Sequence, residues 1–201
     1  QVVHFDTQSI REPRNWIRGC NASLPADIRV QWATQVPDSF HARFAAVQRH
    51  YRYIILNRPG TSALLCNRVC PEYMFLDHAS MAAAGKHFLG EHDFSSFRAA
   101  ACQAKSPVRT IYELEVQRSG DLVYLDVRAN AFLHHMVRCI AGVLIAVGRG
   151  EQQPAWVTEL LAARDRTVSG FNASPAGLYL VAVQYPPEFA LPGSGWLPRY
   201  G

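Results

Sequence analysis

The 201-residue sequence has no long apolar run, and its longest one, residues 139–147, is far too short to cross a bilayer. Its first residues show no charged stretch followed by an apolar one, so no secretory signal is indicated. It has no phosphate-binding glycine loop and no histidine pair with metal-ligand spacing. These absences argue against a membrane protein and give little support to a small-molecule enzyme that depends on a nucleotide or a metal.

Cysteine is sparse and irregularly placed. The five cysteines are odd in number, scattered, and mostly set among apolar neighbours. This pattern is typical of reduced thiols in the cytoplasm rather than of a disulfide framework. Cys66 and Cys70 are the one close pair, and without a second pair or matched histidines they make a poor zinc site. We therefore expect a cytoplasmic protein without a metal.

Lysine is also scarce, because eighteen of the twenty cationic residues are arginine. Residues 1–70 carry nine arginines against four acidic residues, whereas the remainder is nearly balanced. A GC-rich genome would enrich arginine everywhere, while a phosphate-binding surface would use the planar guanidinium for bidentate contacts. Arginines between residues 43 and 58 alternate with aromatic residues. This mixture supplies both charge and stacking surfaces for unpaired bases, and it favours RNA.

Hydrophobic periodicity predicts an α+β fold, with an antiparallel sheet covered by helices on one face and the other face free to bind a partner. Residues 109–116 and 122–128 flank a turn signal and predict a hairpin. The expected strands are 2–5, 28–33, 51–56, 109–116, 122–128 and 178–185, and the expected helices are 13–22, 78–89, 132–148 and 156–163.

Arg138 is the most informative single residue, because it lies in the middle of the most apolar predicted helix. A buried guanidinium needs a carboxylate or phosphate partner, since an unpaired buried charge is very costly. The ordinary alternative is an arginine whose stem lies along the helix edge while its charge reaches water. Because the strand at 122–128 directly precedes this helix, the helix should pack on the sheet, which favours a wall of a binding site.

Seven motifs occur in an order that resembles a known family. They are Gln1-Val-Val-His-Phe5, Asn21-Ala-Ser-Leu-Pro25, Phe40-His-Ala-Arg-Phe44, Arg49-x-Tyr-Arg-Tyr53, Gly90-x-x-Asp-Phe-Ser-Ser-Phe97, Phe132-Leu-His-His-Met-Val-Arg138 and Gly177-Leu-Tyr-Leu180. Together they closely resemble the bacterial tRNA pseudouridine(38–40) synthases, the tRNA pseudouridine synthase A family, along the whole chain. The resemblance implies two ferredoxin-like (RRM-like) halves that share an antiparallel sheet around a basic cleft. Residues 1–44 would be a remnant of the first half, and residues 45–201 the second half with a C-terminal tail.

The resemblance also implies a reaction. Members of the family isomerise uridines 38–40 of the tRNA anticodon stem-loop as homodimers, without metal, redox cofactor or ATP. Their nucleophile is an aspartate in a Gly-Arg-Thr-Asp-Ala-Gly-Val-His motif upstream of the segment that matches residues 1–5. No such motif occurs in these 201 residues, so we expect the chain alone to be inactive. The alternatives are an RNA-binding protein without catalysis and an inactive fragment of the same architecture.

The same resemblance assigns roles to individual residues. Tyr51 would pack against the flipped uracil and assist proton removal, and Arg138 would pair with the catalytic aspartate. Leu178 and Tyr179 would line the uracil pocket. The expected RNA contacts are Arg11, Phe40, His41, Ala42, Arg43, Phe44, Arg52, Arg58, Ala101, Cys102, Gln103, Ala104, Lys105, His134 and His135.

Two other groups of residues invite a chemical interpretation. His134 and His135 would diverge by about 100° on a helix, which makes them a poor metal pair and favours an RNA-facing or structural role. Asp93 is the one acidic residue within these motifs that could be mistaken for the nucleophile. Its Asp-Phe-Ser-Ser-Phe context instead predicts a compact structural turn.

Overall fold

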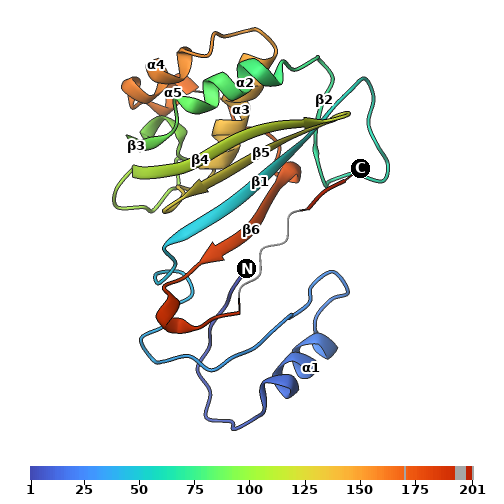
Figure 1. Ribbon diagram of the computed structural model, residues 1–201, viewed down its shortest axis with the longest axis vertical. Helices are drawn as coiled ribbons and strands as arrows, with labels where there is room; N and C mark the ends of the chain where they lie inside the picture. The colour runs from blue at the N-terminus through green and yellow to red at the C-terminus, as the bar shows by residue number, and fades with distance from the viewer. Residues whose placement is uncertain (170, 193–197, 201) are drawn as a thin grey trace.

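The computed structural model describes residues 1–169, 171–192 and 198–200 and shows one six-stranded sheet with helices packed on one face (Figure 1). The strands are β1 (Gln48–Asn57), β2 (Cys70–Glu72), β3 (Gly90–Asp93), β4 (Val108–Ser119), β5 (Leu122–Ala129) and β6 (Leu178–Gln184). Their order is β2-β1-β5-β4-β3, and β6 also pairs with β1. The predicted α+β class and the helices on one face are confirmed, but the sheet is mixed, because β1 and β2 run parallel.

The central strand β1 organises the site because its side chains alternate between two buried environments. Tyr53 and Ile55 belong to the large core under the helices, whereas Ile54 and Leu56 belong to a smaller cluster on the opposite face. Six consecutive buried residues, from Arg52 to Asn57, leave β1 no solvent-facing side in this half. Such a β-branched and aromatic run suits a central strand that is covered on both faces.

Helices of four to thirteen residues cover the face that carries Tyr53. They are α2 (His78–Lys86), α3 (Met136–Gly148), α4 (Trp156–Ala163) and α5 (Arg166–Ser169). Every residue of α3 except Arg138 is buried. Gly85 lets α2 approach the sheet closely, because a β-carbon there would lie 2.6 Å from a methyl group of Leu114. The core is therefore built around α3, and Arg138 is the one residue of this helix whose side chain is partly exposed.

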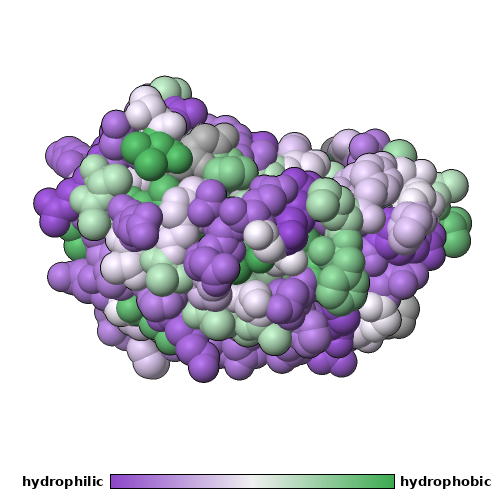
Figure 2. All heavy atoms as spheres, turned by 90° about the horizontal axis from the view of Figure 1, so that it is seen from above, coloured by the Kyte–Doolittle hydropathy of each residue, from purple (hydrophilic) through white to green (hydrophobic). Residues whose placement is uncertain are grey.

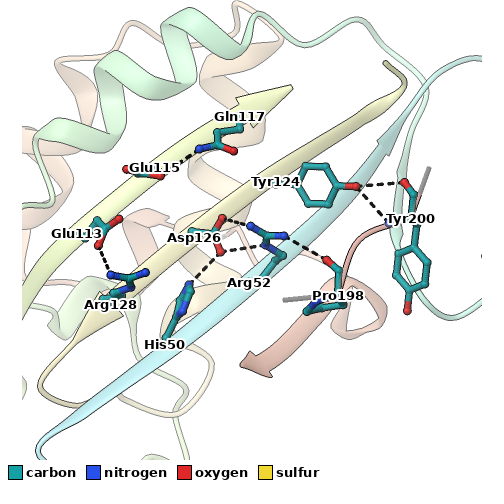
Figure 3. A network of polar contacts seen from close by, with 10 residues as sticks. All are labelled: His50, Arg52, Glu113, Glu115, Gln117, Tyr124, Asp126, Arg128, Pro198 and Tyr200. Carbon is teal, nitrogen blue, oxygen red and sulfur yellow. Dashed lines mark hydrogen bonds and ion pairs between the residues drawn. The ribbon is translucent and has the colours of Figure 1, made fainter. Parts of the chain in front are cut away.

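The opposite face of the sheet is partly covered by polar contacts and by residues 198–200 (Figure 3). Asp126 on β5 accepts hydrogen bonds from both Arg52 and His50, and Arg52 also donates to the carbonyl of Pro198 at 3.2 Å. Tyr124 donates to the carbonyl of Tyr200 at 3.1 Å. The prediction that this face is free to bind a partner is thus wrong for the half that lies beneath residues 198–200.

Residues 1–47 form no strand of this sheet, and their one helix, α1 (Pro13–Ser23), has no buried residue (Figure 1). The helix confirms the prediction for residues 13–22. The predicted strands at 2–5 and 28–33 are wrong, since both segments are irregular in the structure. Alternating sequence makes a strand only where a neighbour supplies hydrogen bonds, and neither segment pairs with a described strand.

Seen from the helical end, the surface is mainly hydrophilic with separate hydrophobic areas (Figure 2). Across residues 1–169, 171–192 and 198–200, none of the helices combines the length and apolar character needed to cross a bilayer.

Candidate active site

Tyr51 lies where β1, β5 and β6 run side by side. It pairs with Val127 on β5 and with Leu180 on β6, and directly paired residues point to the same face of a sheet. Its ring meets the ring of Phe132 edge to face, with centroids 5.0 Å apart and planes at 82°. Burial raises the pKa of the Tyr51 hydroxyl, and the nearby charge of Arg49 opposes this rise. The phenol therefore stays protonated at neutral pH and offers both a ring face and a hydroxyl.

The segment before α3 differs from the prediction. We expected a helix from about residue 132, but α3 begins at Met136, and His134 and His135 lie in the preceding turn. His135 has a φ of +66°, in the left-handed region, and the two imidazole rings lie with centroids 4.0 Å apart and planes tilted by 34°. The predicted divergence of the two histidines is therefore wrong, because it assumed helical geometry. Burial, followed by the charges of His134, Arg138 and Arg166, lowers the pKa of His135.

Arg138 is held by the chain that leads into β6. Its Nε donates to the carbonyl of Ala173 at 2.8 Å, and the amide of Ala173 donates back to the carbonyl of Arg138 at 3.1 Å. Among the residues that the structure describes, no carboxylate lies within ion-pair distance of Arg138. Its charge acts on the side chains of Tyr53 and Cys139. The guanidinium is thus oriented by a carbonyl while its charge remains open to an anion.

Two further contacts fix the start of β6 against β1. The hydroxyl of Tyr53 donates to the carbonyl of Ser174 at 2.6 Å. Gly177 packs directly on the β1 backbone, because a β-carbon there would lie 2.5 Å from the carbonyl oxygen of Ile54. Glycine is therefore required by close approach at this position rather than by its φ.

These contacts separate the two residues that were expected to line a uracil pocket. Leu178 pairs with Tyr53 and packs on the helix-side core, on the same face as Tyr51. Tyr179 points to the opposite face, where its hydroxyl donates to the carbonyl of Arg68. The sequence reasoning missed Leu180, which lies directly opposite Tyr51. The alternation of residues 178–184 is the signal that would have found it.

The expected RNA-contacting segment 40–44 forms a tight arch, which we call the 40–44 arch. The Nδ1 of His41 accepts hydrogen bonds from the amides of Arg43 and Phe44. The rings of His41 and Phe44 lie 4.3 Å apart, and Phe44 is 75% exposed. The exposed guanidinium of Arg43 lies 5.8 Å from the Phe44 ring centre. The arch presents a cation and an aromatic surface side by side, an arrangement that suits an RNA backbone and its bases.

The remainder of the arch faces inward. Phe40 is only 6% exposed and packs against Tyr185 and Phe189. The carbonyl of Ala42 accepts a hydrogen bond from the hydroxyl of Tyr185 at 2.7 Å. The structure therefore gives Phe40 and Ala42 supporting contacts beneath Arg43 and Phe44.

The other expected RNA residues are dispersed. Arg11 is exposed and stacks 5.3 Å from the ring centre of Trp16, far along the chain from β1. Arg58 forms an exposed ion pair with Asp121 at 3.2 Å. Arg52 is 4% exposed and engaged by Asp126 on the face away from Tyr51, so its guanidinium is not presented to solvent.

Residues Ala101–Lys105 alternate between exposed and half-buried positions, with Cys102 and Ala104 packed on the core. Burial raises the pKa of the Cys102 thiol, but hydrogen bonds from the backbone of Ala104 and His134 outweigh it, and the net shift is downward. Ala101, Gln103 and Lys105 remain on the surface. This segment joins the site through its contact with His134.

The alternative sites have structural explanations. Asp93 accepts a hydrogen bond from the amide of Ser95 and lies 3.8 Å from Arg164. Burial raises its pKa, yet the bonds from Ser95 outweigh burial and keep the carboxylate ionised, as expected for a capped turn. Cys66 is exposed and Cys70 is buried. In the described part of the chain no three histidine, cysteine or acidic residues gather as metal ligands would.

Comparison with known proteins gives one consistent result. A family described as "tRNA pseudouridine synthase" matches residues 84–186. The protein named "tRNA pseudouridine synthase A" in Nitrosococcus oceani is 56% identical over 192 residues, which are 96% of this chain and 74% of that protein. Proteins of the same name in Aromatoleum aromaticum and Vibrio parahaemolyticus are 53% and 54% identical and cover 97% and 96% of this chain.

Proposed function

This chain belongs to the tRNA pseudouridine synthase A family, and we propose from that premise that it isomerises uridines 38–40 in the anticodon stem-loop of tRNA. The observation that carries the proposal is the site itself. Tyr51 is fixed against Phe132 on the face where Arg138 offers an unpaired positive charge. Tyr51 and Arg138 thus combine a half-buried phenol with a cation that has no carboxylate partner among the described residues.

The proposed reaction needs no net change in composition. The bond between N1 of uracil and C1′ of ribose breaks, the base rotates, and C5 bonds to C1′. C5 then loses a proton, and N1 gains one, so the electrons balance without a redox partner. The target base must leave its stack to reach the site, as in other enzymes that modify bases.

In this proposal each side chain has one task. Tyr51 stacks on the flipped uracil and assists proton transfer from C5 through its hydroxyl. Arg138 holds the aspartate nucleophile ionised and oriented, because a guanidinium stabilises the charged form of a neighbouring carboxylate. Leu178 and Leu180 supply apolar contact beside Tyr51, since they share its face of the sheet.

We propose that the aspartate comes from a Gly-Arg-Thr-Asp motif outside these 201 residues, which span about three quarters of the length of the relatives. The structure fits this arrangement because Arg138 has no described carboxylate partner. Residues 1–44 then belong to a first ferredoxin-like half and residues 45–201 to a second. The apolar residues Val3, Phe5, Ile10 and Ile28, each more than half exposed, support such a missing neighbour.

Substrate binding in this proposal rests on the 40–44 arch and on the turn at His134 and His135. Arg43 contacts a phosphate, and Phe44 stacks on a base. We propose that the protein acts in the cytoplasm as a homodimer, with one tRNA reaching across both subunits. The family resemblance supports these two points.

A tritium-release assay tests the proposal, using unmodified tRNA that carries tritium at C5 of uridine. The full-length protein is expected to release tritium, and the 201-residue polypeptide is expected to release none. Turnover by a 201-residue species of verified mass would overturn the assignment of the external aspartate. Tight tRNA binding by a full-length protein that releases no tritium would instead favour an RNA-binding protein without catalysis.

A further inference from the structure

Arg49 connects the 40–44 arch to Asn130, the residue that follows β5. One of its terminal nitrogens, NH2, donates to the carbonyl of Arg43 at 2.6 Å. The other, NH1, donates to the carbonyl of Asn130 at 2.9 Å and to that of Ala46 at 3.4 Å. Its guanidinium thus bridges two segments that lie more than eighty positions apart in the sequence.

Asn130 in turn fixes the start of the segment that carries Phe132. Its side-chain oxygen accepts hydrogen bonds from the amides of Thr110 and Ala131, and its own amide donates to the carbonyl of Thr110. Phe132 follows two residues later and contacts the ring of Tyr51. A displacement of Asn130 would therefore be transmitted directly to the aromatic pair.

Arg49 is held by carbonyl groups and has no acidic partner among the described residues. A guanidinium can serve two diverging acceptors because its donors are fixed in one plane, whereas a lysine ammonium acts as a point charge on a flexible stem. The geometry therefore uses the shape of arginine as well as its charge. Arg49 also lies two residues before Tyr51 in β1, and its charge acts on the phenol.

We propose that Arg49 is a positioning residue that couples RNA docking on the 40–44 arch to the alignment of Phe132 and Tyr51. When RNA contacts Arg43, the bond from Arg49 to the Arg43 carbonyl transmits the position of the arch to Asn130. This inference rests on the proposed function, and it goes beyond it by assigning a role to a residue that reaches neither base nor phosphate.

The test compares Arg49→Lys and Arg49→Ala in the full-length protein with Arg128→Ala as a matched control. Arg128 forms a single partly exposed ion pair with Glu113 on the neighbouring strand. Both Arg49 variants should lower the single-turnover rate of pseudouridine formation by roughly tenfold, since small misplacements of reacting groups are costly. They should leave the salt dependence of tRNA binding unchanged, because Arg49 is occupied by carbonyls.

Amide hydrogen exchange supplies a readout that does not depend on catalysis. Exchange should rise together in residues 41–46 and 130–133 of both Arg49 variants and stay unchanged in Arg128→Ala. A rise in only one of the two segments would overturn the bridge. A normal single-turnover rate in Arg49→Lys, with a reduced salt slope in Arg49→Ala, would identify a phosphate contact and overturn the coupling. A wild-type protein that modifies no uridine would refute the proposed function, while the exchange data would still decide whether the bridge exists.

Discussion

The rings of Tyr51 and Phe132 meet edge to face, with centroids 5.0 Å apart and planes at 82°. One ring comes from the central strand and the other from the segment between β5 and α3. Such aromatic pairs contribute about 0.5–1.5 kcal/mol beyond the area that they bury. The contact sets the plane of the Tyr51 ring before any base arrives, which suits a residue on which a flipped base is to stack.

Tyr51→Phe in the full-length protein should fold normally and bind tRNA with unchanged affinity, because the ring and its contact with Phe132 remain. Stacking of a base on such a ring is worth roughly 1–3 kcal/mol and would be kept. Turnover should fall by about a hundredfold, the usual scale of a lost proton-transfer group. Tritium release measures this, and Tyr112→Phe on the exposed surface of β4 is the control. Full activity of Tyr51→Phe would reduce the residue to a stacking platform.

Arg43→Ala should weaken tRNA binding broadly, because the proposed contact of its exposed guanidinium is with a phosphate, which carries no base information. The slope of log affinity against log salt should fall by about 1. A filter-binding titration over several salt concentrations measures it. Arg14→Ala, an exposed position on α1, controls for the general loss of charge. Parallel salt plots for Arg43→Ala and wild type would remove Arg43 from the interface.

Gly177→Ala should destabilise the fold by about 1–3 kcal/mol, because the new methyl group would meet the backbone oxygen of Ile54 at 2.5 Å. Urea denaturation measures the change in the free energy of unfolding. Gly19→Ala is a matched control, since nothing lies within 4 Å of a β-carbon there and the position is helical. That control should be stabilising by up to about 1 kcal/mol. Equal stability of the two variants would contradict the close approach.

Asp126→Asn should lower the free energy of unfolding at pH 7 by about 3 kcal/mol, because it breaks a buried ion pair on one side. Burial raises the pKa of Asp126, but hydrogen bonds from His50 and Arg52 outweigh burial, so the folded-state pKa is depressed. A carboxyl group whose pKa is lowered by folding stabilises the folded state fully when the pH is above its pKa in the unfolded chain, about 3.9. This stabilisation is lost as the pH falls through the pKa in the folded state.

The difference between wild type and Asp126→Asn should therefore be constant from about pH 5 to 7 and shrink below about pH 4. Urea denaturation at several pH values measures it. Asp121→Asn, which removes an exposed pair with Arg58, should cost no more than about 1 kcal/mol. A difference that persists undiminished at pH 3 would show that the carboxylate's charge is not the source.

Local sequence signals predicted the elements that depend on their own residues. The helix at 156–163 and the hairpin of β4 and β5 were confirmed, because periodicity and a turn with Gly120 in the left-handed region suffice to specify them. The inward positions of the helix near residue 80 were also confirmed, since Met81, Ala84 and Phe88 are all buried.

Features that depend on distant partners could not be read from the sequence. Residues 2–5 alternate like a strand yet pair with no described strand, and three-residue β2 joins β1 in parallel without a sequence signal. Arg52 lies in the same Arg-rich motif as Arg49, and only its place in β1 shows that Asp126 engages it on the opposite face. The apolar residues before Met136 continue the helical pattern, so the sequence predicted a helix that begins too early. The left-handed backbone of His135 prevents the helix from extending before Met136.

The single carboxylate of Asp126 serves both His50 and Arg52 (Figure 3). The residues allowed at these three positions therefore depend on one another during evolution. A neutral residue at 126 would leave the buried nitrogen groups of His50 and Arg52 without a charged acceptor. A new side chain at 50 is tolerated when it still donates a hydrogen bond to the carboxylate. In a collection of related sequences, position 50 should vary among donor residues while position 126 keeps its acid, and the rare loss of that acid should accompany replacement of both partners.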